Sequence, residues 1–82
     1  MQFLTDNRPA PAPLTAMQIT LCDNAAAAYN LAYKMLTQGD DKLANDYYQR
    51  GAALMTNAKD LGNNNQNAVL RRIMSKRVYD EN

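Results

Sequence analysis

The chain has 82 residues, which is enough for one small domain. Its formal charge of +1 is nearly balanced, so no overall electrostatic field attracts nucleic acid or an anionic membrane. It contains no histidine and a single cysteine, which excludes an internal disulfide and a cysteine-based metal cluster. Its apolar runs are far shorter than the roughly 20 residues of a membrane span, and its start does not resemble a secretory signal. We therefore expect a cytoplasmic protein, or a virion component if the source is viral.

Residues 1–13 are predicted to form an extended arm that precedes a helical domain over residues 14–82. Prolines alternate with alanines at the end of this arm, which forbids helix and favours a polyproline-type path. Two apolar side chains near its start would anchor it on another chain. The arm residues that we expect to bind a partner are Phe3, Leu4, Pro9, Pro11 and Pro13. The alternative is a tail without function.

The first helix is expected over residues 16–38. Thr15 and Gln18 have the T-x-x-Q spacing of a capping box, in which each side chain bonds the backbone N–H of the other residue. Gly39 suits the left-handed position that ends a helix. Apolar residues recur at steps of three and four between these signals, at Cys22, Ala25, Tyr29, Ala32 and Leu36, with Leu21, Ala28 and Met35 beside them.

A second helix is expected over residues 41–61, with Asp40 or Asp41 as its N-cap. A third is expected over residues 65–79, capped by an asparagine of the preceding "NNNQN" loop. The apolar stripe of the second helix is Ala44, Tyr47, Gly51, Leu54, Ala58 and Leu61, with Leu43, Tyr48 and Met55 beside it, and that of the third is Val69, Leu70, Ile73, Met74 and Val78. A linker of about two residues makes the first two helices antiparallel. The predicted fold is an all-α bundle of three helices with an extended arm.

Small residues on both sides of the hairpin indicate a close helix crossing. Gly51 lies inside a helix, where glycine costs about 0.8 to 1 kcal/mol relative to alanine, so another backbone should pass near it. Ala32 and Ala44 are small at facing positions of the same hairpin.

This pattern over residues 28–54 resembles one tetratricopeptide repeat, a helix–turn–helix unit of about 34 residues. The matching positions are Leu31, Ala32, Gly39, Ala44, Tyr48 and Gly51, and the departures are Ala28, Met35 and Thr56. The hairpin is also similar to that of three-helix MIT-type domains, which bind partner helices in a groove. Convergence is the alternative, because any tight antiparallel hairpin needs small residues at its crossing. One repeat cannot build the groove of the tetratricopeptide family, which takes about three.

No pattern in the chain indicates catalysis or a cofactor. Asp40 and Asp41 are adjacent, so their carboxylates do not converge on one reacting atom, and capping is their expected role. The chain has no phosphate-binding glycine loop, no nucleophile elbow and no metal-ligand spacing. We expect a protein that is not an enzyme and needs no cofactor or metal.

The last helix and the tyrosines supply the other candidate partner-binding residues. Four of the nine basic residues lie on this helix, at Arg71, Arg72, Lys76 and Arg77. Three roles are possible for these cations. They complement the helix macrodipole, or they bind an acidic protein surface, or, ranked third, they contact nucleic-acid phosphates. Tyr33 and Tyr47 are interface candidates because a core this small cannot hold every tyrosine, and core-edge packing is the alternative.

The first hypothesis is therefore a non-catalytic structural protein that docks into a larger protein complex through its arm and helical faces. A virion or a secretion-type machine is the kind of homo- or hetero-oligomeric assembly that we expect. The alternative is a small inhibitor or adaptor that binds a host or regulatory protein through the basic third helix. Binding to nucleic acid ranks below both.

Overall fold

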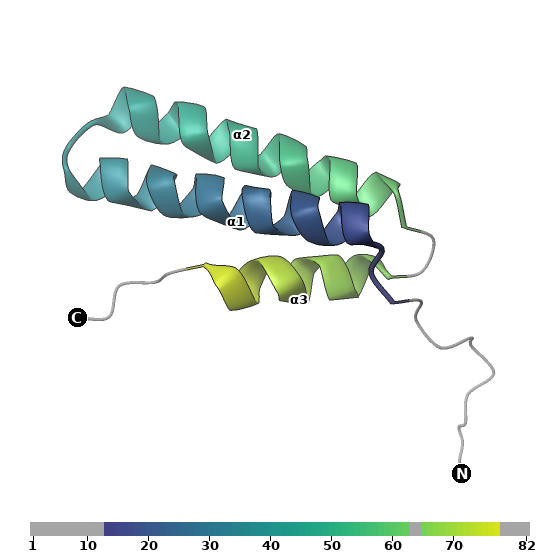
Figure 1. The fold of residues 1–82 in the computed structure, drawn as a ribbon. Coiled ribbons are helices and arrows are strands. Elements are labelled where there is room, and N and C mark those ends of the chain that lie inside the picture. The colour runs from purple at the N-terminus through teal and green to yellow at the C-terminus, as the bar shows by residue number, and fades with distance from the viewer. Residues whose placement is uncertain (1–12, 63–64, 78–82) are drawn as a thin grey trace, which may run out of the picture.

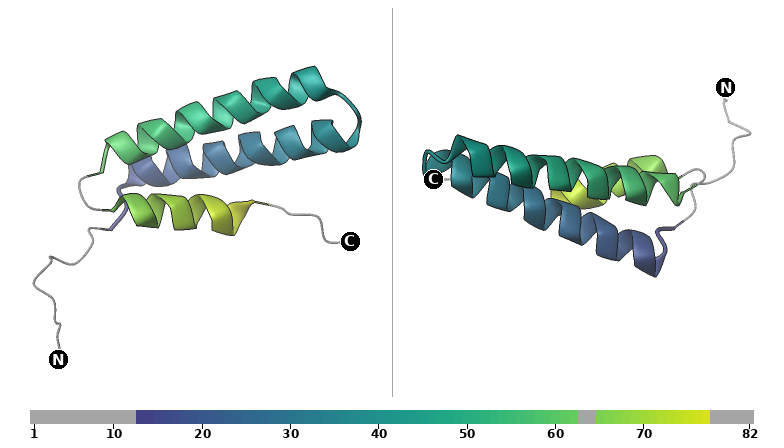
Figure 2. Two further views of the ribbon diagram at one scale, coloured as in Figure 1. Left: turned by 180° about the vertical axis from the view of Figure 1, so that it is seen from behind. Right: turned by 90° about the horizontal axis from the view of Figure 1, so that it is seen from above.

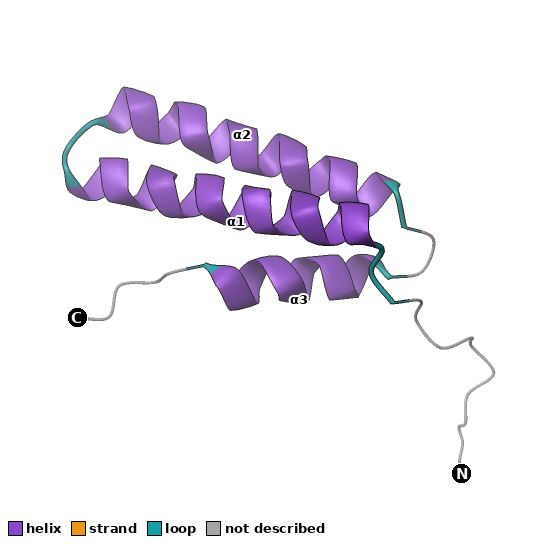
Figure 3. Ribbon diagram, viewed as in Figure 1, coloured by secondary structure: helices purple, strands orange, loops and turns teal. Residues whose placement is uncertain are grey.

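Three helices make up the part of the chain that the structure, a computed structural model, describes: residues 13–62 and 65–77. They are α1 (Ala16–Thr37), α2 (Asp41–Asp60) and α3 (Gln66–Lys76). The first two form an antiparallel hairpin, and α3 lies along one side of it, in contact with both (Figures 1 and 3). The predicted all-α, three-helix bundle is confirmed. The predicted partner residues Phe3, Leu4, Pro9 and Pro11 lie outside the described residues, as does Val78.

Local capping chemistry sets the ends of the hairpin helices. The Gln18 backbone N–H donates to Thr15 Oγ1 over 3.1 Å, and the Thr15 N–H donates to Gln18 Oε1 over 3.0 Å, which confirms the capping box. Gly39 ends the first helix with φ of 85°, in the left-handed region that favours glycine. Of the two candidate aspartates, Asp40 is the cap of α2, and its Oδ1 accepts from the N–H of Leu43 over 3.1 Å.

The hairpin crosses closely at Gly51. A Cβ added there would lie 3.0 Å from two ring carbons of Tyr29 and 3.2 Å from the carbonyl oxygen of Ala25. The glycine and the alanines near it therefore let the two backbones approach. The buried core around this crossing consists of Cys22, Ala25, Ala26, Tyr29, Ala58, Val69 and Ile73, so it contains few large side chains.

The third helix is shorter than expected. It ends at Lys76 rather than near residue 79, because Arg77 takes an extended backbone with φ of −76° and ψ of 143°. At 1.5 Å per residue, α3 is about 16 Å long and α1 about 33 Å, so α3 covers about half of the hairpin (Figure 2). Leu36, which the pattern placed on a core face, lies beyond the end of α3 and is exposed. Leu61 and Met74, also predicted on core faces, are exposed as well.

A buried pair of amides joins all three helices at the end away from the hairpin turn. Gln18 and Asn65, 0% and 3% exposed, exchange two hydrogen bonds of 2.9 and 3.2 Å between their side chains. The Gln18 amide also donates to the carbonyl of Ala58 in α2, and the Asn65 amide donates to the carbonyl of Pro13. Asn65 is the expected asparagine at the N-cap of α3, but its side chain makes no cap hydrogen bond because it is used in this pair.

Candidate functional site

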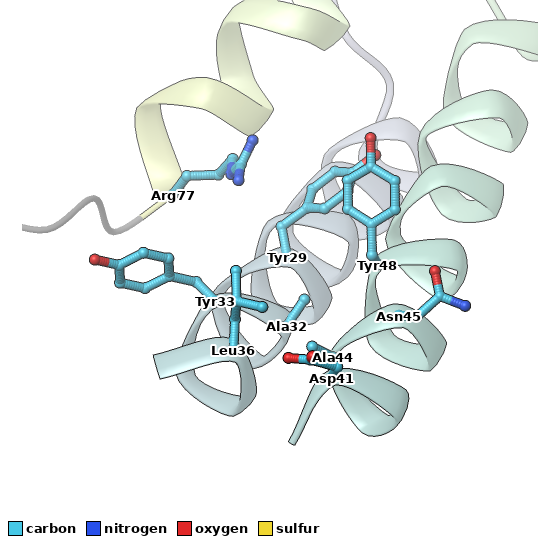
Figure 4. Close-up of a pocket in the computed structure, with 9 residues that line it drawn as sticks. All are labelled: Tyr29, Ala32, Tyr33, Leu36, Asp41, Ala44, Asn45, Tyr48 and Arg77. Carbon is cyan, nitrogen blue, oxygen red and sulfur yellow. The ribbon is translucent and has the colours of Figure 1, made fainter. Parts of the chain in front are cut away.

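The hairpin groove is a hollow between α1 and α2 on the half of the hairpin that α3 does not cover. It has a volume of about 320 Å³. Its lining residues are Tyr29, Ala32, Tyr33, Leu36, Asp41, Ala44, Asn45, Tyr48 and Arg77 (Figure 4). Helical periodicity places them together: 29, 32, 33 and 36 share one face of α1, and 41, 44, 45 and 48 share one face of α2.

Small and large side chains divide the groove into a floor and walls. Ala32 and Ala44 are buried and form the floor of the groove. Because their side chains are small, they leave a space that larger side chains would fill. Tyr33 is 37% exposed, Tyr48 55% and Leu36 57%, so much of the apolar surface around this floor is open to solvent.

An aromatic pair stands at the end of the groove nearer α3. The rings of Tyr29 and Tyr48 lie 5.3 Å apart between centroids at an interplanar angle of 56°, within the range of favourable tilted contacts. Burial raises the pKa of the Tyr29 phenol, so this side chain stays neutral at physiological pH. The Arg77 guanidinium carbon lies 4.7 Å from the Tyr29 centroid, a cation–π distance.

The two ends of the groove carry opposite charges. Arg77 enters from the end of α3, and Asp41 lies at the end near the hairpin turn (Figure 4). The aspartate is exposed in the first turn of α2, where the helix macrodipole favours a carboxylate. The groove is thus an apolar trough with a cation at one end and an anion at the other.

The structure places the two candidate tyrosines on different faces of the hairpin. Tyr33 lines the hairpin groove, whereas Tyr47 lines a second hollow. The residues of this second hollow are Asn24, Ala27, Ala28, Leu31, Tyr47, Arg50 and Leu54. The guanidinium carbon of Arg50 lies 5.9 Å from the Tyr47 ring centroid, so part of this face is covered by the protein's own side chains.

The four basic candidates of the third helix have different surroundings. Arg72 makes a bidentate ion pair with Asp23 of α1, through hydrogen bonds of 2.9 and 3.0 Å. Arg77 lies over Tyr29 in the hairpin groove. Arg71 and Lys76 are exposed. Two of the four cations therefore contact groups of the protein itself, and the two others face solvent.

Sequence reasoning missed Leu36, Tyr48 and Arg77 as one site. The pattern placed Leu36 on the core-facing stripe of the first helix and Tyr48 beside that of the second, and it grouped Arg77 with the cations of its own helix. The lengths of the helices could have indicated this site, because the apolar stripe of the first helix continues to residue 36, farther than a short third helix can cover. Where Arg77 leaves the helix depends on tertiary packing, which the pattern does not contain.

Neither a metal site nor a membrane span is present in residues 13–62 and 65–77. No three cysteine, aspartate or glutamate side chains of this part gather closely enough to hold a metal ion. None of its helices combines the length and the apolar character that crossing a bilayer requires.

Comparison with protein-family models, with curated proteins and with solved structures finds no match for this chain. The site is therefore interpreted from its own geometry.

Proposed function

We propose that this protein is a non-catalytic interaction domain that docks into a larger protein assembly by receiving apolar side chains of another chain in the hairpin groove. The observation that carries the proposal is the exposure of Leu36, Tyr33 and Tyr48 around a preformed hollow. Exposed apolar side chains that gather around a hollow with polar residues at its rim favour a protein–protein interaction site. Aromatic side chains on the walls are also enriched at the energetic centres of interfaces.

The groove ranks ahead of the basic third helix as the docking surface. Arg72 is paired with Asp23, and Arg77 belongs to the groove, so two of the four cations are engaged. A virion or secretion-type machine is retained as the proposed kind of assembly, with the arm as a second contact. A binding role that depends on the basic helix would instead require the exposed Arg71 and Lys76.

A photo-crosslinking amino acid at Leu36 tests the proposal in cells that naturally produce the protein. Met74, which is 60% exposed on α3 and does not line the groove, is the matched control position. We expect a discrete protein adduct from position 36 and none from position 74. In the purified complex, Leu36→Ser should weaken binding about tenfold or more, because it removes about 1.5 to 3 kcal/mol of apolar burial. Equal adducts from both positions, or undiminished binding by Leu36→Ser, would exclude the groove.

A further inference from the structure

The third helix follows the first at a nearly constant offset in residue number. Hydrogen bonds join residues of the two helices or their caps that are 46 to 49 positions apart. In chain order the pairs are Gln18–Asn65, Cys22–Val69, Asp23–Arg72 and Asn30–Lys76. The two helices therefore run parallel (Figure 1), and Lys76 directs the chain toward the α1 residues that follow Asn30. Those residues include Tyr33 and Leu36, which line the hairpin groove.

The end of α3 is fixed at the edge of this groove. The Asn30 amide of α1 donates to the Lys76 carbonyl over 3.2 Å, about one helical turn before Tyr33. Arg77 then leaves the helix with an extended backbone, while its side chain lies over the Tyr29 ring and lines the groove (Figure 4). The residue that follows is thus attached to one that already contacts the groove.

We propose that the Tyr79 side chain of the same chain fills the hairpin groove, so that the protein covers its own docking surface until a partner displaces this tyrosine. Val78 and Tyr79 lie outside the described residues, and the assignment follows from their sequence and from the position of Arg77. The occupancy of the groove within one chain goes beyond the proposed function. Its regulatory consequence, competition with the partner, rests on that function.

The reach of the chain matches the length of the groove. An extended chain advances about 3.3 Å per residue and an α-helix about 1.5 Å. The step from Lys76 to Tyr79 therefore spans up to about 10 Å, which equals about seven residues of α1. Counted from Asn30, this distance ends near Leu36, toward the hairpin turn. Tyr79 is therefore within reach of both Tyr33 and Leu36.

Alternation along an extended chain decides which side chain faces the groove. Successive side chains point to opposite sides, so residues 77 and 79 share one side and residue 78 points the other way. Because the Arg77 side chain lies in the groove, Tyr79 faces the floor of Ala32 and Ala44, and Val78 does not. A tyrosine ring buries about 150 to 250 Å² of surface, and its hydroxyl meets solvent at the open side.

Covalent attachment favours the chain's own tyrosine as the occupant. A segment held by a short linker is present at an effective concentration in the millimolar range, so a contact too weak to hold a separate peptide still forms within the chain. The exposed side chains of Leu36, Tyr33 and Tyr48 supply the apolar surface for this contact. A partner binds only when its affinity exceeds the internal competition.

Nuclear magnetic resonance of the full-length protein, with isotopically labelled methyl groups, tests the contact. We expect nuclear Overhauser effects between the Tyr79 ring and the methyl groups of Ala32, Ala44 and Leu36. Tyr79→Ser should abolish them and shift the Ala32 and Ala44 methyl resonances, whereas Tyr79→Phe should retain both. Val78→Ser is the matched control and should leave these resonances in place.

The regulatory consequence is measured on the protein captured by crosslinking at Leu36. Tyr79→Ser should tighten its binding by the reciprocal of the open fraction, which is about tenfold if about nine-tenths of the molecules are closed. An unchanged affinity would show that Tyr79 does not compete with this partner.

Three other outcomes overturn the internal contact. They are the absence of Overhauser effects from an assigned Tyr79 ring, a shift of the two alanine methyls in Val78→Ser equal to that in Tyr79→Ser, and Overhauser effects only between labelled and unlabelled copies. The last would make a second copy the occupant. The proposed function fails separately: Overhauser effects without a partner adduct at Leu36 would leave the internal contact and exclude docking, and an adduct without them would do the reverse.

Discussion

Gly51 shows at the scale of one residue how the sequence permits the helix crossing. Its missing side chain leaves room for the Tyr29 ring and for the carbonyl of Ala25. The ring cannot move aside easily, because it lies between Tyr48 and the Arg77 guanidinium. The same Tyr29 ring borders the hairpin groove, so Gly51, which permits the crossing, also determines where one side of the site lies.

Gly51→Ala is therefore expected to destabilise the protein. Alanine gains about 1 kcal/mol in helix propensity, but overpacking against a buried ring and a backbone oxygen costs about 1 to 3 kcal/mol. We expect the free energy of unfolding in urea to fall by about 1 kcal/mol net. Gln49→Ala, at an exposed position of the same helix, is the control and should change it by less than about 0.5 kcal/mol. A Gly51→Ala variant as stable as the wild type would show that the crossing tolerates a Cβ.

At the scale of elements, polar contacts join the helices at several points, and at the end of α3 the Asn30 amide of α1 donates to the Lys76 carbonyl over 3.2 Å. The buried Gln18–Asn65 pair joins the start of α1 to the start of α3, and its bond to the Ala58 carbonyl includes the end of α2. Between one and two turns further along, the Arg72–Asp23 ion pair joins α3 to α1 near the surface. These contacts hold α3 in register along the hairpin and so determine where Arg77 meets the groove.

The ion pair makes stability depend on pH. The hydrogen bonds from Arg72 hold the pKa of the Asp23 carboxyl below its ordinary value of 3.8. The charged pair therefore stabilises the folded state fully above about pH 4, and this contribution is lost as the pH falls through the lower folded pKa. We expect Asp23→Asn to lower the urea midpoint at pH 7. The midpoints of variant and wild type should converge as the pH falls below about 4.

The exposed carboxylate of Asp46 on α2 provides the control for this titration. Asp46→Asn should leave the urea midpoint at pH 7 close to that of the wild type, because surface charges without a fixed partner contribute little. A constant difference between Asp23→Asn and wild type across the whole pH range would contradict the assigned role of the ion pair.

At the scale of the whole molecule, one core includes residues from all three helices. Val69 and Ile73 of α3 are buried with Cys22 and Ala25 of α1 and Ala58 of α2. The Cys22 Sγ lies 3.8 Å from the Val69 carbonyl, and burial raises the pKa of its thiol. Because this is the chain's single cysteine, its reaction with a thiol reagent reports opening of the core.

Ile73→Val should increase the rate of this reaction by the factor by which the loss of stability raises the population of the opened state. Removing one buried methyl group costs about 0.5 to 1.5 kcal/mol. A loss of 1 kcal/mol corresponds to about fivefold faster labelling of Cys22 at neutral pH. Met74→Ala, at an exposed position of α3, should leave the rate within about twofold. Faster labelling by Ile73→Val without a change in the urea midpoint would show that α3 opens separately from the hairpin.

The sequence by itself determined the hairpin because its signals are local. Thr15 and Gln18 are three residues apart, and Gly39 and Asp40 are adjacent, so their capping and turn geometry follow from short-range chemistry. The close crossing could also be predicted from the small residues, since a glycine inside a helix is unfavourable and therefore indicates close packing. These features were sufficient for the fold class.

Only the tertiary structure decided the site and the polar contacts that support it. Gln18 and Asn65 are 47 residues apart, and no spacing rule pairs them. The groove exists because α3 ends at Lys76 while the hairpin extends further, which leaves Leu36 and Tyr48 uncovered. A periodic pattern shows which side of a helix is apolar. It does not show how much of that side another helix covers, because coverage depends on the packing of all three elements at once.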